Sequence, residues 1–339
     1  MASRRANLAS IANLPGGLPT AAEPGEFRSH ELELPPEAAG LRFDQALARA
    51  LPQYSRAQLQ AWIESGAAGA VGRSLRGKDR VAGGERVRIH ARLAPLGEVG
   101  AERLPLTVVF RDRALLVIDK PAGMVVHPGA GNPRHTLQNA LLGLDPKLAL
   151  VPRAGLVHRL DKETSGLLVV ARTPEAHTAL VAALAAREIS RQYLAVCTGV
   201  MTGGGTVGEP IGRHRTQRLK MAVRRDGRPA VTHYRVLERF RAHTLVRVEL
   251  GTGRTHQIRV HLAHIGFPVV GDPLYGGRRR LPAGCTPALA AVLSGFHRQA
   301  LHAERLALIH PVNGRRMEWQ APPPADFTGL VAALERDAA

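Results

Sequence analysis

A short charged stretch, HRLDKETSG at residues 158–166, lies between two apolar runs, AGLV at 154–157 and LLVVA at 167–171. Such runs are typical of buried strands, and a charged loop on a rigid scaffold is a common place for a functional group. Asp161 is the candidate: a carboxylate presented to a substrate acts as a nucleophile or as a general base. A solvated turn capped by Asp161 explains the same residues and stays open at this point.

A second stretch, GTGRTHQIRVHLAHIG at residues 251–266, predicts a tight turn followed by a helix with Thr255 as its N-cap. The apolar face of that helix is expected at Ile258, Leu262 and Ile265. Arg254 would then lie at the helix N-terminus, where its guanidinium and the positive end of the helix dipole favour a carboxylate or a phosphate.

The histidines of this stretch do not form a convincing metal site. His256 and His261 are five residues apart and face different sides of a helix, and no cysteine or acidic residue is interleaved. Arg254 and Arg259 would repel a cation. We therefore expect no metal ion.

Tyr193 lies in a third stretch, REISRQYLAVCTG at residues 187–199, on a predicted strand. One interpretation is an ordinary core tyrosine, and the other is an aromatic face on which a nucleobase stacks. The chain contains no GxSxG elbow, P-loop, HExxH motif, or GxGxxG that opens a helix after a strand, so no nucleotide cofactor or other cofactor is expected.

The charge of the chain favours a nucleic-acid partner. Its 339 residues include 46 Lys and Arg against 28 Asp and Glu, a formal net charge of +18. The two cysteines, Cys197 and Cys285, form no CxxC pattern, which suits a reducing compartment. No apolar run approaches the roughly 20 residues that span a bilayer, and residues 1–27 lack a signal-peptide core. We expect a cytoplasmic protein with no membrane contact.

Four regions are predicted along the chain. Residues 1–30, rich in Ala, Gly and Pro, are expected to be a disordered basic arm. Residues 31–94 form a small arginine-rich α+β unit with helices from 43 to 50 and from Ser55 to Gly66, and a strand at 85–91. Residues 95–105 are expected to be a linker, and 106–339 a second domain. Its consecutive strand-like runs and short turns favour a mixed or antiparallel sheet over repeated βαβ units, hence an α+β fold.

The motifs together resemble those of the RluA/RluD family of pseudouridine synthases. The similar segments are GLVHRLDKETSGLLVVAR (155–172), IDKPAGMVVHPG (118–129), GRTHQIRVHLAHIG (253–266), VGDPLYGGR (270–278) and RQALHA (298–303). The resemblance covers residues 105–325 and implies the pseudouridine synthase fold, with a mixed, mainly antiparallel sheet flanked by helices and loops. The unit at 31–94 resembles an S4-type RNA-binding domain, although its AAGAVGR segment departs from the usual pattern.

The resemblance also implies roles for particular residues. Asp161 would be the catalytic aspartate, Tyr193 the tyrosine that stacks on the uracil, and Arg254 the arginine that pairs with the aspartate. Arg159 resembles the arginine that fills the space left by a flipped base. In the S4-like unit, RNA-binding residues are expected at Arg42, Arg56, Arg73, Arg76 and Lys78.

The implied reaction is the cofactor-free isomerisation of uridine to pseudouridine in 23S ribosomal RNA, in the helix-69 stem-loop. The substrate would be that RNA or the assembling large ribosomal subunit, and the enzyme a monomer. Three alternatives stay open: the same isomerase on other ribosomal or transfer RNA uridines, a non-catalytic RNA-binding assembly factor, and a hydrolase of a glycosidic bond. The last is disfavoured, because glycosidases need two facing carboxylates and the loop offers only Glu163 as a partner to Asp161.

Overall fold

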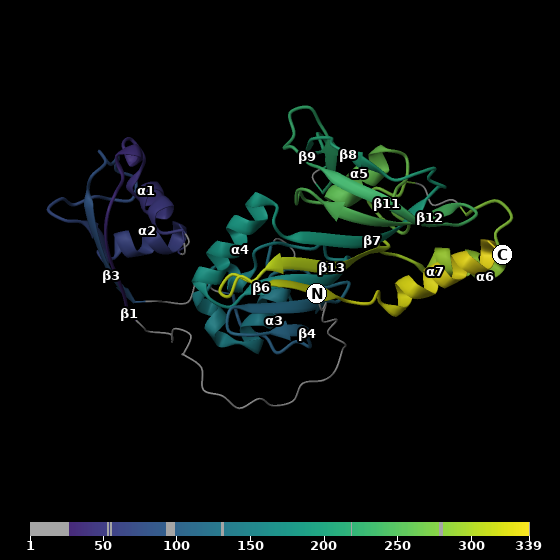
Figure 1. Ribbon diagram of the computed structural model, residues 1–339, viewed down its shortest axis with the longest axis horizontal. Coiled ribbons are helices and arrows are strands. Elements are labelled where there is room, and N and C mark those ends of the chain that lie inside the picture. Colours follow the sequence, from purple (N-terminus) through teal and green to yellow (C-terminus); the bar gives the residue numbers. More distant parts are fainter. Residues whose placement is uncertain are drawn as a thin grey trace.

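The computed structural model describes residues 27–52, 54, 56–92, 99–129, 132–217, 219–277 and 281–338. The described part carries two large hydrophobic cores, one formed by the N-terminal unit together with Leu150 and one formed by the rest of the chain. Figure 1 shows the N-terminal unit in purple and blue at one end of the molecule, with the large sheet and its helices beside it.

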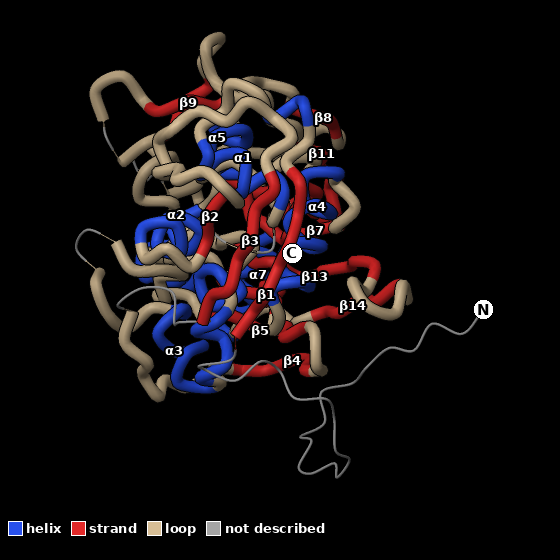
Figure 2. The backbone as a smooth tube through the Cα atoms, turned by 90° about the vertical axis from the view of Figure 1, so that its left-hand side faces the viewer, coloured by secondary structure: helices blue, strands red, loops and turns tan. Residues whose placement is uncertain are grey.

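The N-terminal unit is an α+β structure in which two helices cover a three-stranded sheet. The sheet order is β1-β3-β2, and both pairings are antiparallel. β1 and β3 lie side by side (Figure 2). The elements are β1 (Phe27–Glu33), α1 (Phe43–Ala50), α2 (Arg56–Glu64), β2 (Ala68–Ala70) and β3 (Arg86–Arg92).

Alternation in β3 explains how this unit folds. Its burial pattern runs exposed, buried, exposed from end to end, so Val87, Ile89 and Ala91 face the helices and the arginines face water. The predicted helix at 43–50 and the predicted strand are confirmed. One boundary was wrong: residues 27–30 belong to β1 and pair with β3, because their alternation continues the same sheet. Residues 1–26 and the predicted cap Ser55 lie outside the described residues.

The second domain is built on a nine-stranded mixed sheet with the order β4-β5-β6-β13-β7-β12-β11-β8, and β14 pairs with β13. Only the β6–β13 pairing is parallel among the described strands, so the predicted mixed, mainly antiparallel sheet is confirmed. The strands are β4 (Thr107–Arg111), β5 (Leu115–Lys120), β6 (Ser165–Ala171), β7 (Ser190–Thr198), β8 (Gly205–Val207), β11 (Thr232–Arg239), β12 (His243–Leu250), β13 (Leu301–Ile309) and β14 (Arg316–Gln320).

Several α-helices and a small hairpin complete the described part of this domain. The helices are α3 (Leu137–Leu144), α4 (Pro174–Ala186), α5 (Gln257–His264), α6 (Pro287–Gly295) and α7 (Ala325–Ala338). The hairpin pairs β9 (Ile211–Arg213) with β10 (Met221–Val223) and packs on α5. α6 and α7 lie side by side beyond the far end of the sheet from α4 (Figure 1).

The described part of the predicted linker, residues 99–105, contains no helix or strand but is attached to the second domain. The side-chain amide of Asn139, on α3, donates to the Gly100 carbonyl at 2.7 Å, and the backbone carbonyl of Asn139 accepts the Glu102 N–H at 2.9 Å. These two hydrogen bonds attach Gly100 and Glu102 to α3 of the second domain. The second domain therefore begins several residues before 106.

Candidate active site

Asp161 lies in a turn directly before β6, and its side chain is 16% exposed. The turn is closed by the Thr164 N–H, which donates to the Asp161 carbonyl at 3.1 Å. β6 itself is buried throughout, so the carboxylate is presented from the end of a rigid strand. The predicted charged loop before a buried strand is confirmed, but the first apolar run is not a regular strand, since Pro152–Gly155 form a short 3-10 helix and Leu156 makes only an isolated bridge to Val170.

Close backbone packing fixes the start of β6. Gly166 has a φ of +113°, and a Cβ on it would lie 2.3 Å from the Ala303 carbonyl oxygen of the parallel strand β13. Only glycine is accommodated there without strain. The glycine therefore sets the distance between the Asp161 turn and β13.

Buried cations hold the backbone of the turn. Lys120, at the end of β5, is fully buried and donates to the carbonyls of Pro121, Met124 and Lys162 at 2.8, 3.0 and 3.1 Å. Arg298 donates to the Glu163 carbonyl at 3.2 Å. Burial lowers the pKa of Lys120 to about 7, but the three carbonyls occupy all three protons that only the ammonium form possesses. Lys120 thus acts as a clamp on the turn beside Asp161.

The carboxylate of Asp161 is paired with Arg259 on α5. Nη1 of Arg259 donates to Oδ2 of Asp161 at 3.0 Å. The other side of the same guanidinium binds Asp272 through two hydrogen bonds of 2.6 and 2.8 Å. Burial alone would lower the pKa of Arg259, but its hydrogen bonds to Asp272 and the charges of both carboxylates raise it. A guanidinium held by two carboxylates binds Asp161 through a charge-assisted hydrogen bond and so fixes its orientation.

The predicted pairing of Arg254 with Asp161 is wrong. The Arg254 side chain donates from Nε to the Pro229 carbonyl at 3.1 Å, and its backbone N–H donates to the Gln257 side chain at 2.9 Å. Arg254 therefore belongs to the turn that leads into α5, while Arg259, five residues later, reaches the carboxylate.

The start of α5 explains the error. The helix begins at Gln257, and the N-cap is His256 in the left-handed conformation with φ +57°, not Thr255. The predicted apolar positions at Ile258 and Leu262 are buried, but so are Gln257, Arg259 and His261. Other parts of the protein therefore cover both the apolar and the polar face of α5. Burial of the polar face is possible because its side chains form hydrogen bonds within the protein.

Two of these polar side chains fasten α5 to β11. Gln257 donates to the Val231 carbonyl and to Oγ1 of Thr232 at 2.9 and 3.0 Å. His261 bonds the same Thr232 hydroxyl through Nδ1 at 2.8 Å and the Glu209 carbonyl through Nε2 at 2.9 Å. These bonds fix the rotation of the helix and so aim Arg259 at Asp161.

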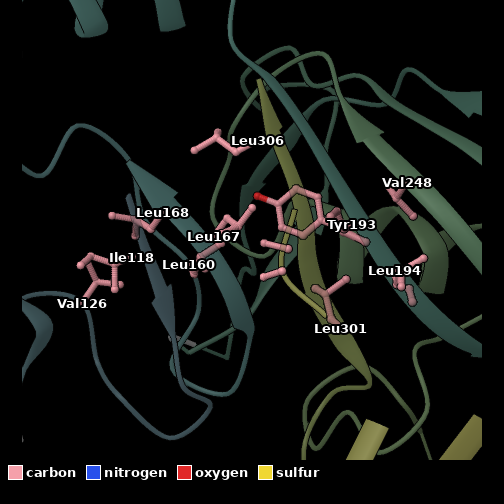
Figure 3. Close-up of a cluster of buried hydrophobic side chains, with 14 of the residues drawn as sticks. Ile118, Val126, Leu160, Leu167, Leu168, Tyr193, Leu194, Val248, Leu301 and Leu306 are labelled. Atoms are coloured by element: carbon pink, nitrogen blue, oxygen red, sulfur yellow. The ribbon is translucent and has the colours of Figure 1, made fainter. Parts of the chain in front are cut away.

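Tyr193 forms an apolar wall of the site. It lies on β7, is 5% exposed, and packs among side chains that include Leu160, Leu167 and Leu306 (Figure 3). Burial raises the pKa of Tyr193, and the nearby charge of Asp161 raises it further against the opposing effect of Arg191. The hydroxyl therefore keeps its proton at neutral pH, and Tyr193 is a neutral aromatic surface close to the carboxylate.

Arg159 and His158 have opposite settings although they are adjacent. Arg159 is exposed. Burial of His127 and His256 is the main cause of their lowered pKa values, and the charge of Arg159 lowers both pKa values further. His158 accepts the Val169 N–H at Nε2 at 3.1 Å, and burial lowers its pKa to about 3. His158 is a neutral structural residue, whereas Arg159 presents an exposed charge beside the site.

Three further residues belong to the site, although the sequence assigned none of them a part in the reaction. Tyr275 stacks its ring at 5.0 Å over the Arg259 guanidinium, and His256 Nε2 lies 3.9 Å from Oδ1 of Asp161. Arg191 is 8% exposed, and its buried Nε has no hydrogen-bond partner among the described residues. The signal for His256 and Tyr275 was their place in the similar segments 253–266 and 270–278, and for Arg191 it was a charged residue on a predicted strand.

Comparison with known proteins indicates which reaction this site catalyses. The chain is 55% identical to the ribosomal large subunit pseudouridine synthase D of Xanthomonas campestris pv. campestris, over 94% of this chain and 96% of that protein. It is 54% identical to the protein of the same description from Pseudomonas aeruginosa, over 90% and 95% of the two chains. Residues 114–264 match the model of the RNA pseudouridylate synthase family.

The chain belongs to that family. Its structure is similar to that of human RNA pseudouridylate synthase domain containing 1, with a TM-score of 0.52 and 28% identity over 70% of this chain and 89% of the human chain. The fold is thus the pseudouridine synthase fold, and the protein is an isomerase that converts uridine in RNA to pseudouridine. The matched region contains Asp161, Tyr193 and Arg259, and ends at α5.

The basic residues of the N-terminal unit fall into two groups. Arg42 and Arg56 both bind the buried carboxylate of Asp44, at 3.1 and 2.8 Å, and so hold α1 and α2 together. Arg73, Arg76 and Lys78 are exposed, and all three lie between β2 and β3. The second group is the better placed to contact a phosphate backbone, since its charges point into solvent instead of joining two helices.

Among the described residues, no group of three or more His, Cys, Asp or Glu side chains is arranged to hold a metal ion. No helix in the described part is long and apolar enough to cross a membrane.

Proposed function

We propose that this enzyme isomerises uridines of 23S ribosomal RNA in the helix-69 stem-loop, and that Asp161 is its catalytic carboxylate. The single observation that supports the catalytic role most strongly is the setting of Asp161: a largely buried carboxylate fixed by a buried Arg259, beside a neutral buried tyrosine. The ribosomal target is supported by the two bacterial relatives, whose names describe large-subunit enzymes.

The reaction breaks the bond between C1′ and N1, turns the uracil, and joins C5 to C1′. It is a rearrangement within one nucleotide, so no group is transferred and no electrons are exchanged with a second molecule. A carboxylate suffices, as a nucleophile toward the sugar or the base or as a base toward a sugar proton. Arg259 holds the carboxylate of Asp161 in position for each of these steps.

Tyr193 and Arg159 have complementary tasks in this proposal. The target uridine must leave its stack, which costs a few kcal/mol and less in a loop than in a duplex. Arg159, exposed and close to Asp161 in the chain, occupies the vacated space, and Tyr193 offers its ring to the freed uracil. Because its hydroxyl keeps its proton, Tyr193 acts as a surface and not as the base that takes the C5 proton.

The N-terminal unit is proposed to be an S4-like RNA-binding domain that binds the RNA backbone, while the residues around Asp161 select the uridine. Arg73, Arg76 and Lys78 are its exposed cations in the loop between β2 and β3. The enzyme works as a monomer on the RNA or on the assembling large subunit, in the cytoplasm where ribosomes are made.

The test is to map pseudouridines in ribosomal and transfer RNA from cells with and without the gene, and from cells that carry only Asp161→Asn. We expect helix-69 uridines to lose modification in both mutant strains, while purified Asp161→Asn still binds the RNA. Modification restored by Asp161→Asn would exclude this carboxylate as the catalyst, and loss at other uridines instead would change the assigned target.

A further inference from the structure

His256 lies next to the catalytic carboxylate in an unusual backbone conformation. It is the N-cap of α5, yet its φ is +57°, and its side chain makes no capping hydrogen bond. Left-handed φ values are uncommon for residues other than glycine and cost about 1 kcal/mol or more, and N-caps are normally Ser, Thr, Asp or Asn. The position therefore gives up helix stability, and the side chain is used for something other than capping.

Both ring nitrogens of His256 face named partners. Nδ1 lies 2.8 Å from the Tyr275 hydroxyl, and Nε2 lies 3.9 Å from Oδ1 of Asp161. The His256 and Asp161 side chains are 17% and 16% exposed, so both are largely shielded from solvent. The second oxygen of Asp161, Oδ2, already belongs to Arg259.

The hydrogen bonds of the Tyr275 hydroxyl favour one of the two neutral tautomers of His256. Met221, on β10, donates its N–H to that hydroxyl oxygen at 2.8 Å. With its oxygen accepting from Met221, the hydroxyl has its own proton to donate, and Nδ1 of His256 is the acceptor. The one proton of the neutral ring is then on Nε2, the nitrogen that faces Asp161.

The surrounding charges are consistent with a neutral ring. His256 is faced by Asp161 from the turn before β6, by Arg259 from α5, by Asp272 from the segment after it, and by Arg159. Burial has the largest effect and lowers the pKa of His256; the two carboxylates raise it and the two arginines lower it, and the net result is a lowered pKa. Burial also raises the pKa of Tyr275, so the hydroxyl retains its proton.

We propose that His256 is a positioning residue that donates its Nε2–H to Oδ1 of Asp161 in the RNA complex, and that Tyr275 holds it in the required tautomer. This inference rests on the proposed catalytic role of Asp161. The distance of 3.9 Å in the free protein shortens to hydrogen-bond length in the complex, which is common for catalytic hydrogen bonds that tighten only with substrate bound. Arg259 and His256 then fix one carboxylate oxygen each, and the carboxylate cannot rotate.

The test uses His256→Asn, because asparagine tolerates the left-handed conformation and is a favourable N-cap, yet is too short to reach Asp161. The substrate is a 23S ribosomal RNA transcript labelled with tritium at C5 of uridine, which is released when C5 bonds to C1′. We expect kcat to fall on the order of 10- to 100-fold with KM nearly unchanged. The melting temperature should stay the same or rise, which a purely structural role would not produce.

Tyr275→Phe is the second variant. It removes the hydroxyl and keeps the ring that stacks over Arg259. It should also lower kcat, by about tenfold, with little change in KM, since the tautomer is no longer fixed. The matched control is His264→Asn, at the exposed end of the same helix, which should behave as the wild type.

Asp161→Asn separates the two proposals. If Asp161→Asn is inactive but His256→Asn and Tyr275→Phe both keep kcat within about twofold of the wild type, the positioning role is wrong and the catalytic role stands. If Asp161→Asn remains active, the catalytic role itself fails. If His256→Asn does not fold, the result for Tyr275→Phe decides by the same criterion.

Discussion

The guanidinium of Arg259 is shared by Asp161 and Asp272, at 3.0 Å from the first and 2.6 Å from the second. Asp272 is fully buried and also accepts the backbone N–H groups of Leu274 and Tyr275. One arginine therefore joins a structural carboxylate to the reactive one, and the orientation of Asp161 depends on the packing of α5 and of the segment after it.

Replacing Arg259 by Gln should abolish most of the activity and destabilise the protein. The change leaves Asp272 buried without its cation, which typically costs about 3–5 kcal/mol. We expect kcat to fall at least about 100-fold, because Asp161 loses both its charge partner and its orientation. Tritium release and thermal denaturation measure the two effects separately.

Arg254→Gln is the matched comparison for that variant. Among the described residues its side chain hydrogen-bonds only to the Pro229 carbonyl, so kcat should remain within about threefold of the wild type. If Arg254→Gln were as inactive as Arg259→Gln, the assignment of Arg259 as the partner of Asp161 would be refuted.

Lys120→Met should loosen the turn that carries Asp161. The part-buried carbonyls of Pro121, Met124 and Lys162 lose their common donor, which should lower the free energy of unfolding by roughly 1–3 kcal/mol. Chemical denaturation measures this decrease. Hydrogen exchange should show faster opening at residues 161–164 than in the wild type, whereas unchanged exchange there would show that Lys120 does not hold the turn.

His158→Gln should make the protein less sensitive to acid. Burial, with a further contribution from the charge of Arg191, lowers the pKa of His158 from 6.5 to about 3. As pH falls from 6.5 toward 3, the unfolded chain takes up a proton that the folded chain does not, so stability is lost over that window, by up to about 4 kcal/mol. Glutamine can accept the Val169 N–H without titrating.

The measurement for His158 is the free energy of unfolding at several pH values between about 7 and 4, the range in which the unfolded chain takes up this proton. The wild type should lose stability more steeply than His158→Gln, and His264→Gln, at an exposed site, should follow the wild type. Parallel curves for all three proteins would mean that His158 is not kept neutral by the fold. His243 and His302, which are buried and have lowered pKa values, should leave some acid sensitivity in every variant.

Neutralising Arg73, Arg76 and Lys78 together should weaken RNA binding in a salt-dependent manner. Removing one phosphate interaction lowers the slope of log K against log salt by about 0.7 to 0.9, so the slope should fall by about 2 if all three side chains bind the backbone. The single-turnover rate at saturating enzyme should not change. Arg88→Gln is the control in the same unit, because Arg88 is already paired with Glu31 at 2.7 Å. An unchanged slope would contradict RNA binding by this loop.

Local patterns in the sequence were sufficient for much of the architecture. The alternation at residues 85–91 predicts β3, and helical spacing predicts α1, because each signal depends on which face of one element is buried. The charged stretch between two apolar runs located Asp161 in the same way. The end of the arm was misplaced because residues 27–30 become a strand only when β3 lies beside them.

The sequence by itself determined the fold class, the basic character of the protein and the loop that carries the reactive carboxylate. Only the tertiary structure decided which cation holds that carboxylate. The sequence favoured Arg254, at the predicted helix N-terminus. The structure selects Arg259, because His256 is in the left-handed region and Gln257 and His261 are bonded to β11, so that α5 is rotated with Arg259 facing Asp161. Hydrogen bonds between segments far apart in the chain set that rotation, and no local pattern records them.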